Sequence, residues 1–285
     1  MKKKFIGILM SLAVVASLTA CGSGDSAPAE TGDTQTTADN ETLDDPEAVA
    51  EKTTFTVGFD ASFPPYGYKD DNGEYVGFDL DLAQEVCDRL GYELVKQPID
   101  WDAKDMELSS GTIDCIWNGF TINGREDKYC WSEPYIDNSQ VFVVAADSDI
   151  KTKADLAGKT VVVQADSSAL KALESEENVD LTNSFAELVQ VSDYNTAFMN
   201  MEAGAADVVA MDVGVAKYQL EERNGEFVIL EEELASEVYG VGFELSNTAL
   251  RDQVQGTLNE MIADGTFVQI AEKWGLQDSV ILETK

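Results

Sequence analysis

The sequence predicts an α/β fold of two similar lobes joined by two strands. Three observations support this prediction: strands alternate with helices, one stretch of that alternation is repeated, and two further strands bracket the repeat. Alternating strands and helices form a mainly parallel sheet covered by helices. Each bracketing strand would pass from one lobe to the other and act as a hinge.

The first lobe is predicted from the alternation after the N-terminal region. A strand is expected in FTVGFD, which ends at Asp60, and a helix begins at Asp79 after a turn-rich loop. A second strand is expected in YELVKQP (92–98), a helix in DAKDMELSSG (102–111) and a strand in IDCIW (113–117).

The second lobe is predicted from a repeat of that order. In MELSSGTIDCIW a helix ends at a glycine, an aspartate follows three residues later and an apolar strand begins; MEAGAADVVAM repeats this with Gly204 and Asp207. The strands SQVFVVAA and EVYGVGFEL bracket the repeat. Lobe 1 is therefore expected in 53–142 and 241–285, and lobe 2 in 143–240.

The N-terminal residues have the composition of an export signal. Residues 1–20 contain three lysines and then an apolar run too short to span a membrane. Residues 18–21 are LTAC, which resembles the lipobox of bacterial lipoproteins and implies a lipid on Cys21; the alternative is a secreted protein with a chance cysteine. Residues 21–52 contain many acids and few large apolar residues, so a disordered tether is expected.

The overall composition excludes several function classes. A formal net charge of −35 argues against nucleic acid or anionic lipid as a binding surface. Histidine is absent, which removes Ser-His-Asp and Cys-His catalysis and His-ligated metal sites. No metal or cofactor is expected. Cys87 lies on the apolar face of a predicted helix, whereas Cys115 and Cys130 could pair in an exported protein.

Polar and aromatic residues lie at or just after predicted strand ends in both lobes. They are Asp60, Trp101, the turn from Asn118 to Arg125, the turn from Gln164 to Ala169, and Asp212. Open α/β sheets bind ligands at these strand ends, so the residues should converge on one cleft. Arg125 offers a planar fork for a carboxylate, and Asp212 offers the opposite charge. Together they would suit an α-amino acid, because a buried charge needs a partner.

Each of these residues also has a structural interpretation. Asp212 could cap the helix that follows it. Arg125 could form a surface ion pair with the two acids after it. Phe63 and Trp101 could be ordinary core aromatics.

Five motifs in this order resemble the family 3 solute-binding proteins of bacterial ABC importers for polar amino acids. They are DASFPPYGYKDDNGEYVGFDLDLAQEV, NGFTINGRE, VVVQADSS, VVAMD and VYGVGFEL, and the resemblance covers roughly Thr54 to Gly275. It implies the two-lobed periplasmic-binding-protein (Venus flytrap) fold and no enzyme activity. The expected partners are a polar L-amino acid, an ABC permease and its ATPase. A monomer, lipid-anchored to the outer face of the cytoplasmic membrane, is expected.

The resemblance also implies how the backbone atoms of the ligand are held. Arg125 would bind the α-carboxylate with help from Thr121 and Ser168, and Asp212 would bind the α-ammonium with Gly119 and Thr121. The full set of implied ligand-binding residues is Asp60, Phe63, Trp101, Asn118, Gly119, Thr121, Arg125, Gln164, Ser167, Ser168 and Asp212.

The resemblance further implies which residues contact the side chain of the ligand. Phe63 and Trp101 would sandwich it, while Asp60, Asn118 and Gln164 would read its polar end. Because Asp60 would accept an amide or a cation, glutamine and the basic amino acids are favoured, with cystine as a further candidate.

The sequence departs from the family pattern at three places. The turn before Arg125 is one residue shorter than usual, and Asp166 stands where relatives generally have glycine. Cys87 matches a cysteine that forms a disulfide in some relatives, but Leu94 stands at the partner position, so that bond should be missing.

Two alternative functions use the same fold. One is an enzyme similar to periplasmic dehydratases of cyclic carboxylic acids, in which Asp60 or another carboxylate would be the acid or base. The other is an amino-acid-sensing domain of a receptor.

Overall fold

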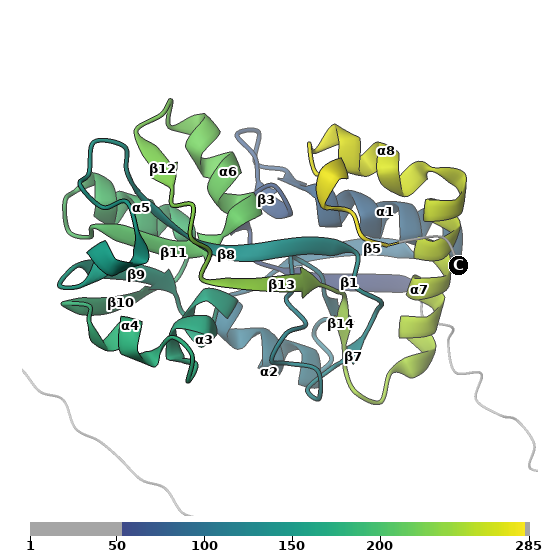
Figure 1. Ribbon diagram of the computed structural model, residues 1–285. Helices are drawn as coiled ribbons and strands as arrows, with labels where there is room; N and C mark the ends of the chain where they lie inside the picture. The colour runs from purple at the N-terminus through teal and green to yellow at the C-terminus, as the bar shows by residue number, and fades with distance from the viewer. Residues whose placement is uncertain (1–52, 283–285) are drawn as a thin grey trace, which may run out of the picture. The chain divides into compact units, whose positions relative to one another are not determined.

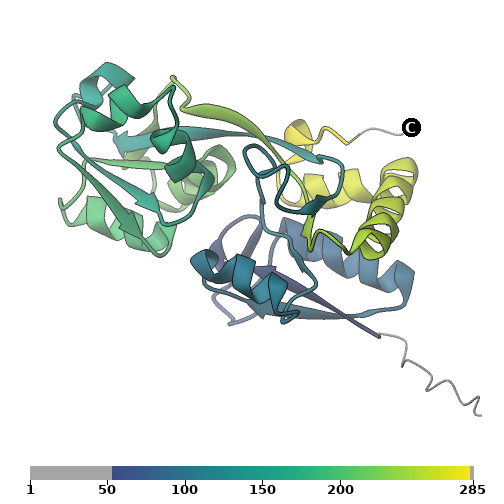
Figure 2. The same ribbon diagram turned by 90° about the horizontal axis from the view of Figure 1, so that it is seen from below.

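The computed structural model describes residues 53–282, which belong to one compact unit of the chain. The predicted signal, Cys21 and the predicted tether lie outside the described residues. Two main sheets with their helices make up the described part, and Figure 2 shows them as two groups connected by long strands. The predicted two-lobed α/β fold is confirmed.

The first sheet contains five strands. Their order is β5 (Glu93–Pro98), β1 (Thr54–Phe59), β6 (Cys115–Ile116), β14 (Gly242–Phe243) and β7 (Cys130–Trp131). β1 is parallel to β5 and β6, whereas β14 is antiparallel to both of its neighbours. The helices of this lobe are α1 (Phe78–Leu90), α2 (Lys104–Ser109), α7 (Thr248–Asp264) and α8 (Thr266–Lys273). α1, α7 and α8 pack together, as Figure 1 shows.

The second sheet has the order β10 (Glu187–Val191), β9 (Thr160–Gln164), β11 (Val208–Asp212), β8 (Ile136–Ala145) and β12 (Phe227–Ile229), and β13 (Ala235–Tyr239) also pairs with β8. β9, β10 and β11 are mutually parallel, whereas β8 is antiparallel to its neighbours. Its helices are α3 (Ser168–Glu174), α4 (Val179–Asn183), α5 (Tyr194–Glu202) and α6 (Val213–Glu222).

The two connecting strands are β8 and β13, which pair with each other antiparallel (Figure 1). The stretch EVYGVGFEL, expected as one strand, instead contributes β13 to one sheet and β14 to the other. Two glycines explain the break. A Cβ at Gly240 would lie 2.7 Å from Ile122 Cδ1, and one at Gly242 would lie 2.7 Å from Phe120 Cε1, so only a residue without a side chain lets the backbone pass this close.

Several local predictions need correction. Both sheets are mixed rather than mainly parallel, and the strand expected over 113–117 is reduced to β6. The loop after Asp60 contains a small third sheet of β2 (Ser62–Phe63), β3 (Gly67–Lys69) and β4 (Tyr75–Val76). β8 begins three residues before the expected SQVFVVAA. The extra residues include Asn138, which is buried and whose side chain bonds Asp212 and Glu237, so it is not part of an exposed loop.

Helix starts in the second lobe follow from local capping. The Ser167 hydroxyl accepts a hydrogen bond from the Leu170 N–H at the start of α3, and the Asp193 carboxylate accepts one from the Thr196 N–H at the start of α5. Such caps satisfy N–H groups that have no partner inside the helix. They fix the direction in which both helices leave the strand ends.

The cysteines form no disulfide framework in the described part of the chain. Cys87 is buried in the core and forms no disulfide, as expected from Leu94 at the partner position. Cys130 forms none with another described residue, and β14 separates its strand from that of Cys115. Over residues 53–282, no helix has the length and apolar character needed to cross a membrane. The same residues contain no group of three or more Cys, Asp or Glu placed to hold a metal ion.

Candidate functional site

One small cavity brings together nine of the eleven predicted ligand-binding residues. Its lining is Phe63, Trp101, Asn118, Gly119, Thr121, Gln164, Ser167, Ser168 and Asp212. We call it the inner cavity. Its volume is about 10 Å³, roughly the room that one water molecule needs. A molecule the size of an amino acid can therefore enter only if the lobes separate or side chains move.

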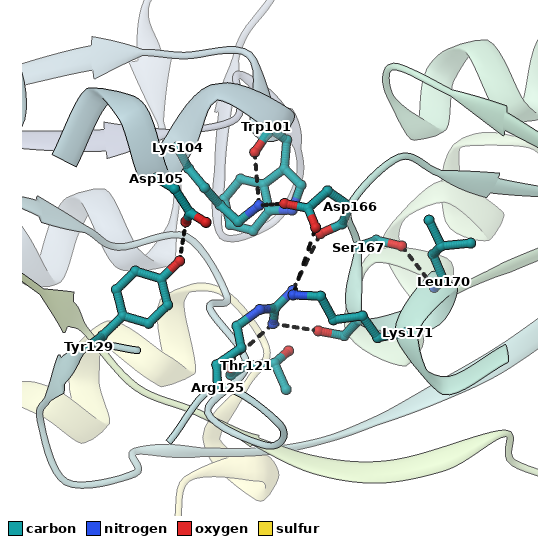
Figure 3. Close-up of polar contacts among 11 residues, drawn as sticks. Trp101, Lys104, Asp105, Thr121, Arg125, Tyr129, Asp166, Ser167, Leu170 and Lys171 are labelled. Carbon is teal, nitrogen blue, oxygen red and sulfur yellow. Dashed lines mark hydrogen bonds and ion pairs between the residues drawn. The ribbon is translucent and has the colours of Figure 1, made fainter. Parts of the chain in front are cut away.

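Arg125 lies beside this cavity and is 1% exposed. Its Nη1 donates to the Thr121 carbonyl oxygen at 3.1 Å and to the Ser168 hydroxyl at 2.9 Å, and its Nη2 donates to the Asp166 carbonyl oxygen at 3.3 Å (Figure 3). Burial lowers the pKa of Arg125 from its ordinary value. The Nε atom has no hydrogen-bond partner among the described residues.

This environment rules out the surface ion pair as an explanation of Arg125. The guanidinium makes hydrogen bonds to neutral oxygens from both lobes, not to the two acids that follow it in sequence. It also lies over the Phe120 ring, with Cζ 5.2 Å from the ring centroid. A buried cation bonded to neutral acceptors has unused capacity for an anion.

Asp212 ends β11 and is 4% exposed. It occupies the N-cap position of α6, but its side chain makes no capping hydrogen bond, so the cap interpretation is wrong. Oδ1 instead accepts hydrogen bonds from Asn138 Nδ2 at 3.1 Å, from Gln140 Nε2 at 2.8 Å and from the Tyr239 hydroxyl. Burial raises the pKa of Asp212, and the hydrogen bonds from its neighbours oppose that shift.

Asp60 does not line the inner cavity but connects the two lobes beside it. Its Oδ2 accepts a 2.7 Å hydrogen bond from Gln164 Nε2, so the end of β1 is joined to the end of β9. Its backbone N–H donates to Asn118 Oδ1 at 3.0 Å. Burial raises the pKa of Asp60 to about 6 despite hydrogen bonds from Ser62 and Gln164 that lower it. Asn118 Nδ2 has no partner within the described chain.

Gly119 must be a glycine for two reasons. Its φ is +56°, and a Cβ there would lie 2.8 Å from Phe63 Cε1. Its N–H donates to the buried Asp79 Oδ2 at 2.6 Å. Asp79 also accepts from the Tyr135 hydroxyl at 2.8 Å, and thus fixes the turn that leads to Thr121 and Arg125.

The two aromatic residues line the cavity from the same lobe. Phe63 belongs to the main core and contacts Tyr194 with ring centroids 6.0 Å apart. Trp101 is partly exposed and packs edge-on against Phe120 with centroids 5.5 Å apart. The core interpretation is correct for Phe63, but both rings also line the cavity.

A cluster of charges that the sequence did not predict lies beside Arg125. Lys104, on α2, is 1% exposed and pairs with Asp166 of the other lobe, as Figure 3 shows. Its Nζ also donates to the Trp101 carbonyl oxygen at 3.1 Å. Lys171 Nζ lies 3.7 Å from Asp166 Oδ1, and burial followed by the charge of Arg125 lowers its pKa to about 8. Asp166, at a φ of +51°, is the residue at which a glycine was expected from the resemblance.

A second, larger cavity adjoins the first, and Trp101 lines both. We call it the outer cavity; its volume is about 610 Å³. Five of its lining residues are acids: Asp60, Asp100, Asp102, Glu107 and Asp193. Because lysine and arginine are absent from its lining, its electrostatic potential favours a cation.

Comparisons with known proteins agree with the motifs. The family profile described as "Bacterial extracellular solute-binding proteins, family 3" matches residues 55–277. The chain is 29% identical over 287 residues to the L-cystine-binding protein TcyA of Bacillus subtilis (strain 168), covering 98% of this chain and 99% of that protein. It is 30% identical over 230 residues to the L-cystine-binding protein TcyJ of Escherichia coli (strain K12), covering 79% and 84% of the two chains.

A solved structure gives the corresponding match in three dimensions. An ABC uptake transporter substrate binding protein from Streptococcus pneumoniae with bound histidine superposes with a TM-score of 0.77 and 34% identity. The match covers 81% of this chain and 95% of that one.

Proposed function

The chain belongs to family 3 of the bacterial extracellular solute-binding proteins, and we propose that it captures an L-amino acid with a cationic far end for an ABC importer. The main supporting observation has three parts. Arg125 bonds neutral oxygens such as the Ser168 hydroxyl, Asp212 lines the inner cavity, and five acids line the outer cavity beside it. The proposal has three parts: the clamp, the side-chain site and the membrane anchor.

The clamp would hold the two charged groups that all α-amino acids share. The ligand carboxylate would replace the weak 3.3 Å contact between Arg125 and the Asp166 carbonyl oxygen, and would accept from the Ser168 hydroxyl. The ligand ammonium would lie beside Asp212, near Gly119 and Thr121. Because these residues come from both lobes, the ligand would favour the closed arrangement.

The side chain of the ligand would point past Trp101 into the outer cavity. Asp60 lines the outer cavity together with four further acids, and it bonds Gln164, which lines the inner cavity. A guanidinium, an ammonium or an imidazolium would gain from that potential, whereas a neutral amide gains less. Basic amino acids are therefore favoured over glutamine, which stays a candidate because Gln164 and Asn118 could bond its amide.

Cystine is the second candidate. Two relatives are named as L-cystine-binding proteins, and cystine carries a second ammonium at its far end. The outer cavity, at about 610 Å³, is large enough for the second half of cystine. The second carboxylate would meet the acidic lining, which disfavours cystine relative to arginine or lysine.

A thermal-shift screen followed by calorimetry tests the proposal. Arginine, lysine, ornithine, histidine, glutamine and cystine would be compared, with glutamate and leucine as matched negative ligands. Micromolar binding of a basic amino acid, about −8 kcal/mol, is the expected result. Tightest binding by glutamate or leucine would contradict it.

The N-terminal part of the proposal concerns attachment. Cys21 would carry the lipid that anchors a monomer to the outer face of the cytoplasmic membrane, and residues 22–52 would tether it. The closed, ligand-bound form would dock on a permease driven by an ATPase. The dehydratase alternative relies on Asp60, which here bonds Gln164; turnover of prephenate would favour that alternative.

A further inference from the structure

Two acidic side chains lie together behind the inner cavity, and the clamp uses just one of them. Asp212 is 4% exposed and Glu237 is 5% exposed. Their carboxyl groups lie against the same two amide nitrogens, those of Asn138 and Gln140. Two buried carboxylates that share donors repel each other when both are ionised, so this arrangement favours one proton on the pair.

Both carboxyl groups share the same donors. Asn138 Nδ2 lies 3.1 Å from Asp212 Oδ1 and 2.7 Å from Glu237 Oε1, and Gln140 Nε2 lies 2.8 Å and 2.7 Å from the same two oxygens. The amide nitrogens therefore bridge the pair. No lysine or arginine is salt-bridged to either acid in the described chain.

Glu237 and the two amide donors lie on the strands that connect the lobes, and Asp212 lies at the end of the neighbouring β11. Asn138 and Gln140 lie on β8, and Glu237 lies opposite Asn138 on β13. Thr121, from the other side of the cleft, donates its hydroxyl to Glu237 Oε1 at 3.0 Å. Glu237 thus bonds the cavity-lining Thr121 directly and is linked to the cavity-lining Asp212 through Asn138 and Gln140, without lining the cavity itself. It would act on a ligand through them, as a positioning residue.

Three tyrosines and one arginine face the pair of acids. Tyr66, Tyr194 and Tyr239 surround it, and burial raises the pKa of each, so all three stay neutral. Arg125 is the cation whose charge reaches both acids. Burial, and then the charge of Asp212, raise the pKa of Glu237 to about 8. Burial raises the pKa of Asp212 as well, so at neutral pH the coupled pair retains a proton.

We propose that Asp212 and Glu237 share one proton in the ligand-free protein, and that the ligand ammonium displaces it to solvent. This step rests on the proposed function, since it needs an ammonium beside Asp212. A positive charge at that position favours the ionised form of both acids. The Glu237 O–H bond breaks, its electron pair stays on the carboxylate, and the proton goes to the buffer.

The consequence is an affinity that depends on pH. In the ligand-bound protein the pair would lose its proton at lower pH than in the ligand-free protein. Affinity should then rise by up to about tenfold per pH unit as the pH approaches about 8, and level off above it. A site with a single ionised aspartate would show no such rise near neutral pH.

A ligand-free experiment tests the shared proton directly. The side-chain carboxyl ¹³C resonance of Glu237, assigned by its loss in Glu237→Gln, should titrate near pH 8. A midpoint near the ordinary glutamate value of about 4.3 would overturn the proposal. If Glu237→Gln does not fold, Glu237→Asp serves for the assignment because its resonance shifts.

A calorimetric experiment tests the displacement. Binding of the amino acid found in the screen is measured near neutral pH in two buffers with different ionisation enthalpies, which gives the number of protons released. Wild type should release a substantial fraction of one proton, and Glu237→Gln should release much less, because glutamine keeps the hydrogen bonds but cannot ionise. Glu231→Gln removes the same charge from an exposed position and should behave as wild type.

Two other acids need to be separated from this effect. Burial raises the pKa of Asp60 to about 6 and that of Asp79 to about 7, and both lie near the cleft. The difference between wild type and Glu237→Gln isolates the contribution of Glu237. Equal proton release by the two proteins would overturn the displacement. If no amino acid binds, the proposed function fails, while the ¹³C titration still decides whether the proton is shared.

Discussion

Arg125 Nη1 donates a 2.9 Å hydrogen bond to the hydroxyl of Ser168, which joins the turn after β6 in one lobe to the first residue of α3 in the other. The contact has a neutral acceptor, so it satisfies the geometry of the guanidinium but not its charge. It holds Arg125 in place for a carboxylate that would contact both lobes.

Replacing Arg125 with alanine or lysine should therefore remove most amino-acid affinity. The loss should be about 2–5 kcal/mol, because a desolvated carboxylate would lose its bidentate partner. Isothermal calorimetry measures it. Arg89→Lys is the matched control, since Arg89 pairs with Glu85 and Asp264 away from the cleft. Near-normal binding by Arg125→Ala would remove Arg125 from the clamp.

Asp166→Asn tests whether the ion pair with Lys104 keeps the ligand-free protein closed. Asparagine tolerates the positive φ of this position, so the backbone is retained while the charge is lost. Lys104 would then be a buried cation without its partner in the closed form. Because the Asp166 side chain is 40% exposed, water screens the pair and the cost should be about 1–2 kcal/mol.

If this cost shifts the ligand-free protein toward separated lobes, small-angle X-ray scattering will show a larger radius of gyration. Lys171→Met is the control, because it removes a second lysine that faces Asp166. Lys171 Nζ lies 3.7 Å from Asp166 Oδ1, and its side chain is 34% exposed, so its ion pair should contribute less than that of the buried Lys104. An unchanged radius for Asp166→Asn would mean that other contacts, such as Asp60 with Gln164, keep the cleft closed.

Because of Asp79, the free energy of unfolding should fall as the pH rises from about 4 to about 7. Burial raises the pKa of Asp79 to about 7, while the Gly119 N–H and the Tyr135 hydroxyl oppose the shift. The folded protein thus holds a proton that the unfolded chain, with a pKa of about 3.9, has released. The contribution is complete below that lower value and is lost as the pH rises, at up to about 1.4 kcal/mol per unit.

Urea unfolding at several pH values in this window measures the slope. Asp79→Asn should flatten it, although the amide offers one acceptor oxygen fewer and so lowers the absolute stability. Asp88→Asn, at an exposed position of the same helix, should keep the wild-type slope. An identical slope in wild type and Asp79→Asn would show that Asp79 is ionised in the folded protein at all these pH values.

Cys21→Ser should release the protein from the membrane if LTAC is a lipobox. Membrane fractionation of cells that express each form would detect the change. A truncated protein that begins at Thr53 should bind its amino acid normally, because every cavity-lining residue lies beyond that point. Mass spectrometry that finds unmodified Cys21 in the mature protein would contradict the lipid anchor.

The sequence predicted those features of the site that depend on local order. Gln164 and Asp212 are the last residues of β9 and β11, and Arg125 lies in the turn after β6. Strand ends are visible in the pattern of apolar residues and turns. Glu237 was missed because its burial depends on the register that pairs it with Asn138 across β8 and β13.

Lys104 was missed for a similar reason. Lysine on a short polar helix is expected at the surface, and its burial depends on Asp166, a residue of the other lobe. Asn138, Gln140, Asp212 and Glu237 form a buried set of hydrogen bonds that we call the hinge network. Its one available signal in the sequence was the spacing of Asn138 and Gln140 two residues apart in β8. Two polar residues that are two positions apart in an otherwise apolar strand indicate a buried polar partner, but the sequence does not show which residue that partner is.

Asp212→Asn separates the clamp from a purely structural role. Asparagine keeps the shape and can still accept from Gln140 and Tyr239, and α6 gains nothing from the Asp212 side chain as a cap. If Asp212 pairs with a ligand ammonium, affinity should fall by roughly 2 kcal/mol or more, the range for losing one partner of a buried charge pair. The melting temperature of the ligand-free protein should change little or rise, because burial already disfavours the Asp212 charge. Calorimetry of wild type and mutant measures both quantities, with Asp207→Asn, at an exposed position of the same lobe, as the control. Unchanged affinity would remove Asp212 from the clamp, and a large fall in melting temperature with unchanged affinity would assign the residue to the hinge network alone.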